Sequence, residues 1–222
     1  MACHRFGAPQ LAAAQGGRQE AAATAKRQQA AAVRERFAPL KVVVLLIALA
    51  ACQHKSDLPE LFPVPNASLV DENNRPVQLD SMKGTVTVYD FIFTNCSGIC
   101  PIMSRNMAEL TKRIPKDAPV RFVSISVDPA RDTPERLREY AKRFRRDDRW
   151  TFLTGDREAI IRLSVDGFKL AAGDPEPGGE ALLHSSRFAV ADRNGVIREY
   201  YAGTDGDAPE HVAATVRDLL GE

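Results

Sequence analysis

The chain has 222 residues, of which 44% are hydrophobic and 27% are charged, enough for one globular domain with additional segments. The net charge of +1 is unevenly distributed, because residues 1–52 hold 7 basic and 2 acidic residues while the remainder holds 23 basic and 27 acidic ones. A mildly acidic body lacks the basic surface of a nucleic-acid-binding protein, so we expect no nucleic-acid partner.

Residues 1–32 are rich in Ala, Gln and Gly and show no apolar periodicity, which predicts a low-complexity leader outside the fold. Two interpretations remain open for this segment. It is either an over-extended reading frame, with translation starting at Val33, or the long basic region of an export signal.

Residues 33–51 have the organisation of a lipoprotein signal peptide. Basic residues precede the apolar run Val42–Leu49, which is shorter than the roughly 20 residues of a membrane-spanning helix. The run ends in Leu49-Ala50-Ala51-Cys52, which resembles a bacterial lipobox. We therefore expect Cys52 to be lipidated and the protein to be anchored in the bacterial cell envelope; a plain cleaved signal or a membrane anchor is the alternative.

Residues 52–66 contain three prolines and predict a lipid anchor and tether. The body, residues 67–222, then alternates strands with helices. An N-terminal hairpin is expected over 67–79, strands over 85–93, 120–127 and 150–153, and a hairpin over 188–200 with a two-residue turn at Asn194-Gly195. Helices are expected from Pro101 to about Ile114, from Pro134 to Phe144, over 157–165 and over 209–220. This order predicts an α/β, thioredoxin-like fold with an N-terminal β-hairpin extension.

Cys96 and Cys100 are the cysteines of the body, and they lie between a predicted buried strand and a predicted helix start. A bridge that closes so short a loop would stabilise the fold little, so redox chemistry or metal binding is the better interpretation. A helix N-terminus favours the thiolate, and two sulfur ligands favour Cu(I) or Zn(II).

Other candidates have simpler explanations. Met103 and Met107 could be soft ligands, but their helical spacing favours the core. Asp128 could tune a thiol or form the turn at Pro129, and we favour the turn. His211 is expected at the surface. The seven basic residues over 136–149 predict a solvated helix face or, alternatively, a docking surface for an acidic partner.

Three blocks of sequence resemble the Sco/SenC family of copper proteins. They are Phe91 to Pro101, Ser124 to Glu135, and His184 with the following segment through Gly195. The resemblance implies that Cys96, Cys100 and the distant His184 hold copper, as Cu(I) or Cu(II). It also implies as partners the copper-bearing subunit of cytochrome c oxidase and other periplasmic copper carriers.

Two functions follow from this resemblance. A copper chaperone binds the metal and transfers it, whereas a thiol–disulfide oxidoreductase would use Cys96 and Cys100 as a redox-active pair to keep target cysteines reduced. The implied third ligand, His184, and the spacing of three residues between the cysteines favour the chaperone.

Overall fold

A mixed β-sheet organises the part of the chain that the computed structural model describes, residues 56–144, 147–170 and 185–222. Its order across the sheet is β1-β8-β7-β4-β5-β6-β2-β3. The bounds in that order are β1 Phe62–Pro63, β8 Val196–Ala202, β7 Arg187–Ala191, β4 Val86–Ile92, β5 Val120–Ser126, β6 Trp150–Thr154, β2 Ser68–Asp71 and β3 Pro76–Gln78. The central strands β4, β5 and β6 are parallel, and the flanking pairs are antiparallel.

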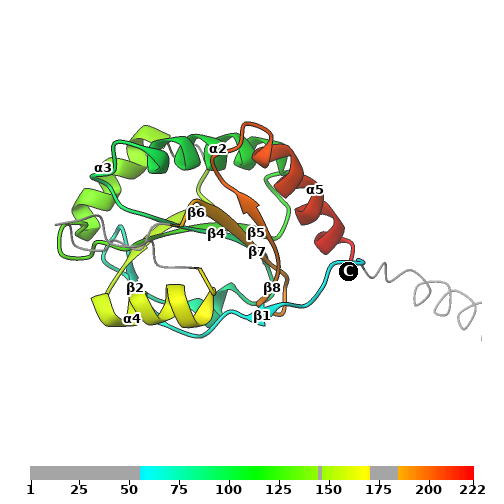
Figure 1. Ribbon diagram of the computed structural model, residues 1–222, viewed down its shortest axis with the longest axis horizontal. Coiled ribbons are helices and arrows are strands. Elements are labelled where there is room, and N and C mark those ends of the chain that lie inside the picture. The colour runs from blue at the N-terminus through cyan, green and yellow to red at the C-terminus, as the bar shows by residue number, and fades with distance from the viewer. Residues whose placement is uncertain (1–55, 145–146, 171–184) are drawn as a thin grey trace, which may run out of the picture. The chain divides into compact units, whose positions relative to one another are not determined.

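Helices cover both faces of this sheet. The helices α2 (Ile99–Arg113), α3 (Pro134–Phe144) and α5 (Ala208–Leu220) pack on one face, and α4 (Arg157–Arg162) packs on the other (Figure 1). A short 3-10 helix, η1 (Leu79–Met82), precedes β4, and a π-helical segment, η2 (Leu163–Gly167), follows α4. Two apolar cores therefore lie between the sheet and its two helical layers.

The alternation along β4 decides which side chains lie beneath α2. Val88 and Ile92 join the core under α2, α3 and α5, whereas Tyr89 and Phe91 join the core on the α4 face. Because side chains alternate between the faces of a strand, Asp90 points into the same layer as Val88 and Ile92. A carboxyl group is thus placed inside the apolar layer below the first turns of α2.

The structure confirms the expected fold class. The N-terminal hairpin is β2–β3, added to the edge of the sheet beside β6, and the closing hairpin β7–β8 and final helix α5 follow as predicted. The leader, the signal segment and the lipobox with Cys52 lie outside the described residues. Within the described ranges, no helix has the length and apolar character needed to cross a membrane.

Two local expectations are wrong. Helix α2 begins at Ile99 rather than Pro101; Pro101 is tolerated inside the first turn because the first N–H groups of a helix have no intrahelical partner. The β7–β8 connection is not a two-residue turn at Asn194-Gly195, because β7 ends at Ala191 and β8 begins at Val196, and the turn is closed by a hydrogen bond from the Gly195 N–H to the Asp192 carbonyl oxygen. The Asp192 carboxylate also accepts hydrogen bonds from the backbone N–H groups of Asn194 and Val196.

A candidate metal and thiol site

Cys96 lies in the loop between β4 and α2, and Cys100 lies in the first turn of α2. The loop is held by a 3.3 Å hydrogen bond from the backbone N–H of Cys96 to the carbonyl oxygen of Phe93. Both thiols are free; Cys96 is half-buried, whereas Cys100 is only 2% exposed. Cys96 is therefore partly exposed to solvent, whereas Cys100 lies in the core on the sheet side of α2.

The two thiols are close enough to influence one another. Burial raises the pKa of Cys100 most strongly, a backbone hydrogen bond with Phe93 opposes the rise, and the Cys96 side chain and the Asp90 carboxyl group add to it. The expectation that the helix N-terminus favours a thiolate is thus not met at Cys100, because burial outweighs it. A metal ion must displace the proton of Cys100 in order to bind its sulfur.

Asp90 is an unusual group in this layer, and the sequence reasoning missed it. Its side chain is fully buried, and neither carboxylate oxygen makes a hydrogen bond of good geometry within the described ranges. Burial raises the pKa of Asp90 to about 7, although the neighbouring Ser124 hydroxyl partly opposes the rise. An acidic residue at an inward position of a strongly apolar strand was the signal that could have found it.

A second buried carboxylate fixes the loop before Cys96. Asp132 is fully buried and accepts hydrogen bonds from the backbone N–H of Thr94 at 2.9 Å and from the hydroxyls of Thr94 and Ser126 at 2.5 and 2.6 Å. The Arg136 Nε donates to the Thr94 hydroxyl oxygen at 2.9 Å. The segment after β5 and the first turn of α3 thereby position the backbone that leads into the cysteine loop. Sequence reasoning missed the role of Asp132.

The other candidates lie where the simpler interpretations put them. The Asp128 carbonyl oxygen accepts hydrogen bonds from the backbone N–H groups of Arg131 and Asp132, which is the predicted turn. Met103 and Met107 are completely buried in the core, and His211 is exposed on α5.

His184 and Cys52 lie outside the described residues, so their places relative to the cysteines stay predictions. Across 56–144, 147–170 and 185–222, no cluster of three His, Cys, Asp or Glu side chains is arranged to hold a metal ion. The described site is thus a pair of neighbouring thiols, which can supply two soft ligands to a metal or join in a disulfide.

The comparison with known families gives one family. A profile described as SCO1/SenC matches residues 64–221. The SCO1 protein homolog of Bacillus subtilis is 32% identical over 179 residues, which cover 78% of this chain and 92% of that protein.

Solved structures agree with this similarity. BsSco, described as a member of the Sco family of cytochrome c oxidase assembly proteins with a disulfide switch, is 31% identical with a TM-score of 0.64, covering 74% of this chain and 96% of that one. Bradyrhizobium japonicum ScoI with copper bound is 27% identical with a TM-score of 0.60, covering 72% and 99%.

Proposed function

The chain belongs to the SCO1/SenC family, and on that premise we propose that it is a copper chaperone that helps to assemble the binuclear copper centre of cytochrome c oxidase. Cys96, Cys100 and His184 hold the metal in this proposal. The copper-bearing oxidase subunit receives it, and other periplasmic copper carriers supply it. Similarity to a copper-bound ScoI and to a Sco protein described as an assembly factor supports the assignment.

The observation that carries the proposal is the pair of free, neighbouring thiols at the β4–α2 junction. Two thiolates favour Cu(I), a soft ion, over hard cations. Their different exposure suits transfer, because an incoming acceptor can reach Cys96 first while Cys100 remains in the core. The buried proton of Cys100 makes binding and release sensitive to proton exchange.

Metal analysis of the reduced protein tests the proposal. We expect one copper per chain, loss of Cu(I) and Cu(II) binding in Cys96→Ser and Cys100→Ser, and a greater loss of Cu(II) than of Cu(I) in His184→Ala, since an imidazole suits the harder ion. Fully oxidised protein should not take up copper, because a disulfide offers no thiolate. Undiminished copper binding by the oxidised protein would contradict the site.

A thiol–disulfide oxidoreductase is the second candidate, and the pair of free, neighbouring thiols favours it because two such thiols can join in a disulfide. A deletion strain separates the two functions. Added copper should partly restore oxidase activity if the chain delivers copper, whereas restoration by an added thiol but not by copper would support the oxidoreductase.

The proposal includes an exported protein held in the bacterial cell envelope by a lipid on Cys52. The lipobox at residues 49–52 supports it. Intact mass spectrometry of the membrane fraction should show a mature chain that starts at a lipidated Cys52; a mature chain that retains earlier residues would exclude this anchor.

A further inference from the structure

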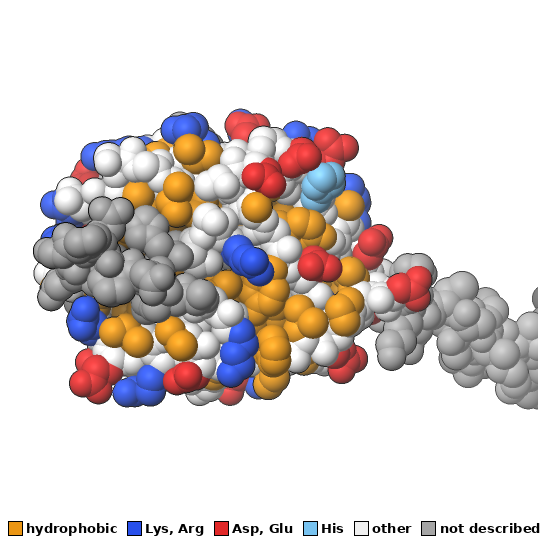
Figure 2. All heavy atoms as spheres, viewed as in Figure 1, with side chains coloured by type: hydrophobic (Ala, Val, Ile, Leu, Met, Phe, Trp, Pro, Cys, Tyr) orange, Lys and Arg blue, Asp and Glu red, His pale blue; other side chains and the backbone are white. Residues whose placement is uncertain are grey.

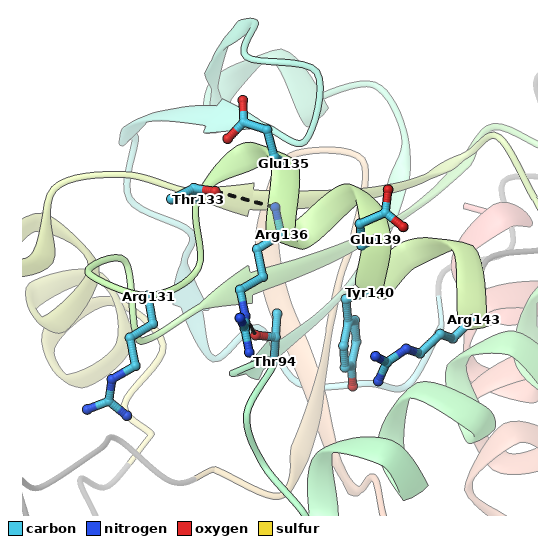
Figure 3. A pocket seen from close by; sticks show the side chains of 8 residues that line it. All are labelled: Thr94, Arg131, Thr133, Glu135, Arg136, Glu139, Tyr140 and Arg143. Atoms are coloured by element: carbon cyan, nitrogen blue, oxygen red, sulfur yellow. Dashed lines mark hydrogen bonds between the residues drawn. The ribbon is translucent and has the colours of Figure 1, made fainter.

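An open pocket of about 560 Å³ lies beside the cysteine loop, between that loop and α3 (Figure 3). Thr94, two residues before Cys96, forms part of its wall. Tyr140 forms another part, and its hydroxyl is hydrogen-bonded to Ser104 of α2 at 2.8 Å. The Tyr140 side chain also lies near enough to both cysteines for their charges to contribute to the raised pKa of its hydroxyl, although burial is the larger cause. A molecule in this pocket would therefore contact Thr94, at the start of the loop that carries Cys96, and Tyr140, which is hydrogen-bonded to the helix that carries Cys100.

Three guanidinium groups line the pocket: those of Arg131, Arg136 and Arg143. In Figure 3 their head groups extend to the same side as the Tyr140 hydroxyl, while the carboxylates of Glu135 and Glu139 project the opposite way. Positive charge thus gathers on the side of the pocket that Tyr140 shares. By contrast, the face in Figure 2 mixes basic, acidic and apolar side chains.

Part of this charge is held in place before any partner arrives. Arg136 donates to Thr94 at 2.9 Å and lies 4.0 Å from the buried Asp132 carboxylate, and Arg131 lies 3.4 Å from Asp128. Asp132 already accepts hydrogen bonds from Thr94 and Ser126, so its charge is shared among several donors. Guanidinium groups are suited to carboxylates, which they bind through paired, charge-assisted hydrogen bonds.

We propose that this pocket, the arginine pocket, binds an acidic segment of the protein that exchanges copper or electrons with Cys96 and Cys100, with one or more carboxylates beside the partner's own cysteine. The proposal rests on the proposed function and specifies how the partner is recognised. Arg131 and Arg143 attract and orient the segment, and Arg136 links that recognition to the loop that carries Cys96. Electrostatic attraction of this kind mainly accelerates encounter and fixes register.

Thiol–disulfide exchange between the oxidised protein and short synthetic peptides tests the proposal without copper. A peptide thiolate attacks the Cys96 sulfur, a peptide–Cys96 disulfide forms, and Cys100 leaves as a thiolate that takes up a proton. A second peptide thiol then releases the peptide disulfide and leaves both protein cysteines reduced, so two electrons pass to the protein.

Two peptides are compared, one with a Cys flanked by four Glu residues and one with a Cys flanked by four Gln residues. The rate at which each peptide reacts with the protein is divided by the rate at which the same peptide reacts with the neutral hydroxyethyl disulfide. We expect the Glu peptide to react roughly fivefold to tenfold faster at low ionic strength, and the preference to shrink as salt is added. Arg131→Gln/Arg143→Gln should abolish the preference. The matched control Lys112→Gln/Arg162→Gln removes the same charge from exposed positions outside the pocket and should retain it.

A second measurement needs no disulfide. Iodoacetate and iodoacetamide both alkylate a thiol with loss of iodide and a proton, and they differ chiefly in charge. The iodoacetate-to-iodoacetamide rate ratio at Cys96, normalised to 2-mercaptoethanol, should exceed one in the wild type and fall to about one in the double arginine variant.

Equal normalised rates for the two peptides, or a preference that survives in the double arginine variant, would overturn the arginine pocket as a recognition site. Such a failure leaves copper binding intact and is therefore distinguishable from failure of the proposed function. An iodoacetate preference without a peptide preference would also overturn it, since the pocket would then attract small anions and not an acidic segment.

Discussion

Two buried charged side chains, at opposite ends of the sheet, differ in how they are satisfied. Arg198 lies near the start of β8, at the end of the sheet where β4 begins, and is 2% exposed. Its guanidinium donates to the carboxylates of Asp192 and Glu222, each at 3.0 Å, and to the carbonyl oxygens of Leu58 and Pro59. Asp90, near the other end of β4 below Cys100, makes no comparable bonds.

This difference indicates that Arg198 stabilises the fold, whereas Asp90 is placed to affect the thiol site. Arg198 joins the segment around Ser56 to the C-terminal Glu222, since Ser56 donates to the same carboxylate through both its backbone N–H and its hydroxyl. The Arg198 guanidinium and the carboxylates of Asp192 and Glu222 are thus all paired with one another. Asp90 has a pKa near neutrality and neighbours a thiol, so its charge can change when the site exchanges a proton or a metal.

Removing the Arg198 charge should have the largest effect on stability. Arg198→Met leaves the carboxylates of Asp192 and Glu222 without their buried partner, so we expect a loss of about 3–5 kcal/mol in the free energy of unfolding. Urea unfolding at neutral pH measures it, with the exposed Arg217→Met on α5 as control. A loss no greater than that of the control would show that the cluster is not the structural link described.

Replacing Asp90 should increase the stability of the protein rather than reduce it. Its folded-state pKa lies above the ordinary value of 3.8, so the folded state retains a proton that the unfolded state loses, and stability should fall as pH rises from about 4 to about 7. In reduced, copper-free protein at pH 8, Asp90→Asn should therefore be more stable than the wild type by up to about 4 kcal/mol. Urea unfolding from pH 4 to 8 should show the difference growing with pH; a constant difference would contradict the raised pKa.

Glu222 provides an internal contrast to Asp90. Although burial alone would raise its pKa, hydrogen bonds from Ser56 and Arg198 lower it, so this group contributes stability that is lost as pH falls through its folded pKa, below the ordinary 4.5. Glu222→Gln should reduce stability at pH 7 but not at pH 2, opposite in direction to Asp90→Asn. If Glu222→Gln instead became more stable relative to the wild type as pH rises, as expected for Asp90→Asn, the contrast between Glu222 and Asp90 would be contradicted.

The smallest effect is expected at Tyr140, where only one neutral hydrogen bond is lost. Tyr140→Phe removes the 2.8 Å bond to Ser104 between α3 and α2 and should lower stability by about 1 kcal/mol. Phe144→Leu, on the same helix, is a control for apolar packing alone. Thermal unfolding of the two variants measures the difference, and an unchanged Tyr140→Phe would indicate that the hydroxyl contributes nothing to that contact.

The sequence predicted the elements well because their signals are local. The apolar strand at 85–93, Pro134 at a helix start and the closing hairpin each carry their pattern within a few residues. The start of α2 and the Gly195 turn were misplaced because both depend on which backbone groups find partners. A docking surface for an acidic partner over 136–149 was one of two alternatives from the sequence, but the structure was needed to bring Arg136 and Asp132 to Thr94, because Asp132 lies 38 residues from Thr94 along the chain. No local pattern records that contact.

The raised pKa of Cys100 also could not be predicted from the sequence. The position of Cys100 at a helix N-terminus suggested a thiolate, but its raised pKa follows chiefly from its burial in the apolar layer, with smaller contributions from Cys96 and then Asp90. Burial on this scale is a property of the whole layer and is not visible in the cysteine spacing.

The pH dependence of Cu(I) uptake tests most directly the central claim, that the buried, protonated Cys100 thiol and the half-buried Cys96 thiol bind copper. Because the pKa of Cys100 is raised, each Cu(I) bound near neutrality should displace a thiol proton, so the apparent affinity of the reduced protein should rise by about tenfold per pH unit for each proton released. Competition with a Cu(I) indicator between pH 6 and 8, with proton release measured in parallel, should show that slope in the wild type, whereas Cys100→Ser should bind Cu(I) too weakly to compete. An affinity independent of pH, Cu(I) binding without proton release, or undiminished Cu(I) binding by Cys100→Ser would contradict the account.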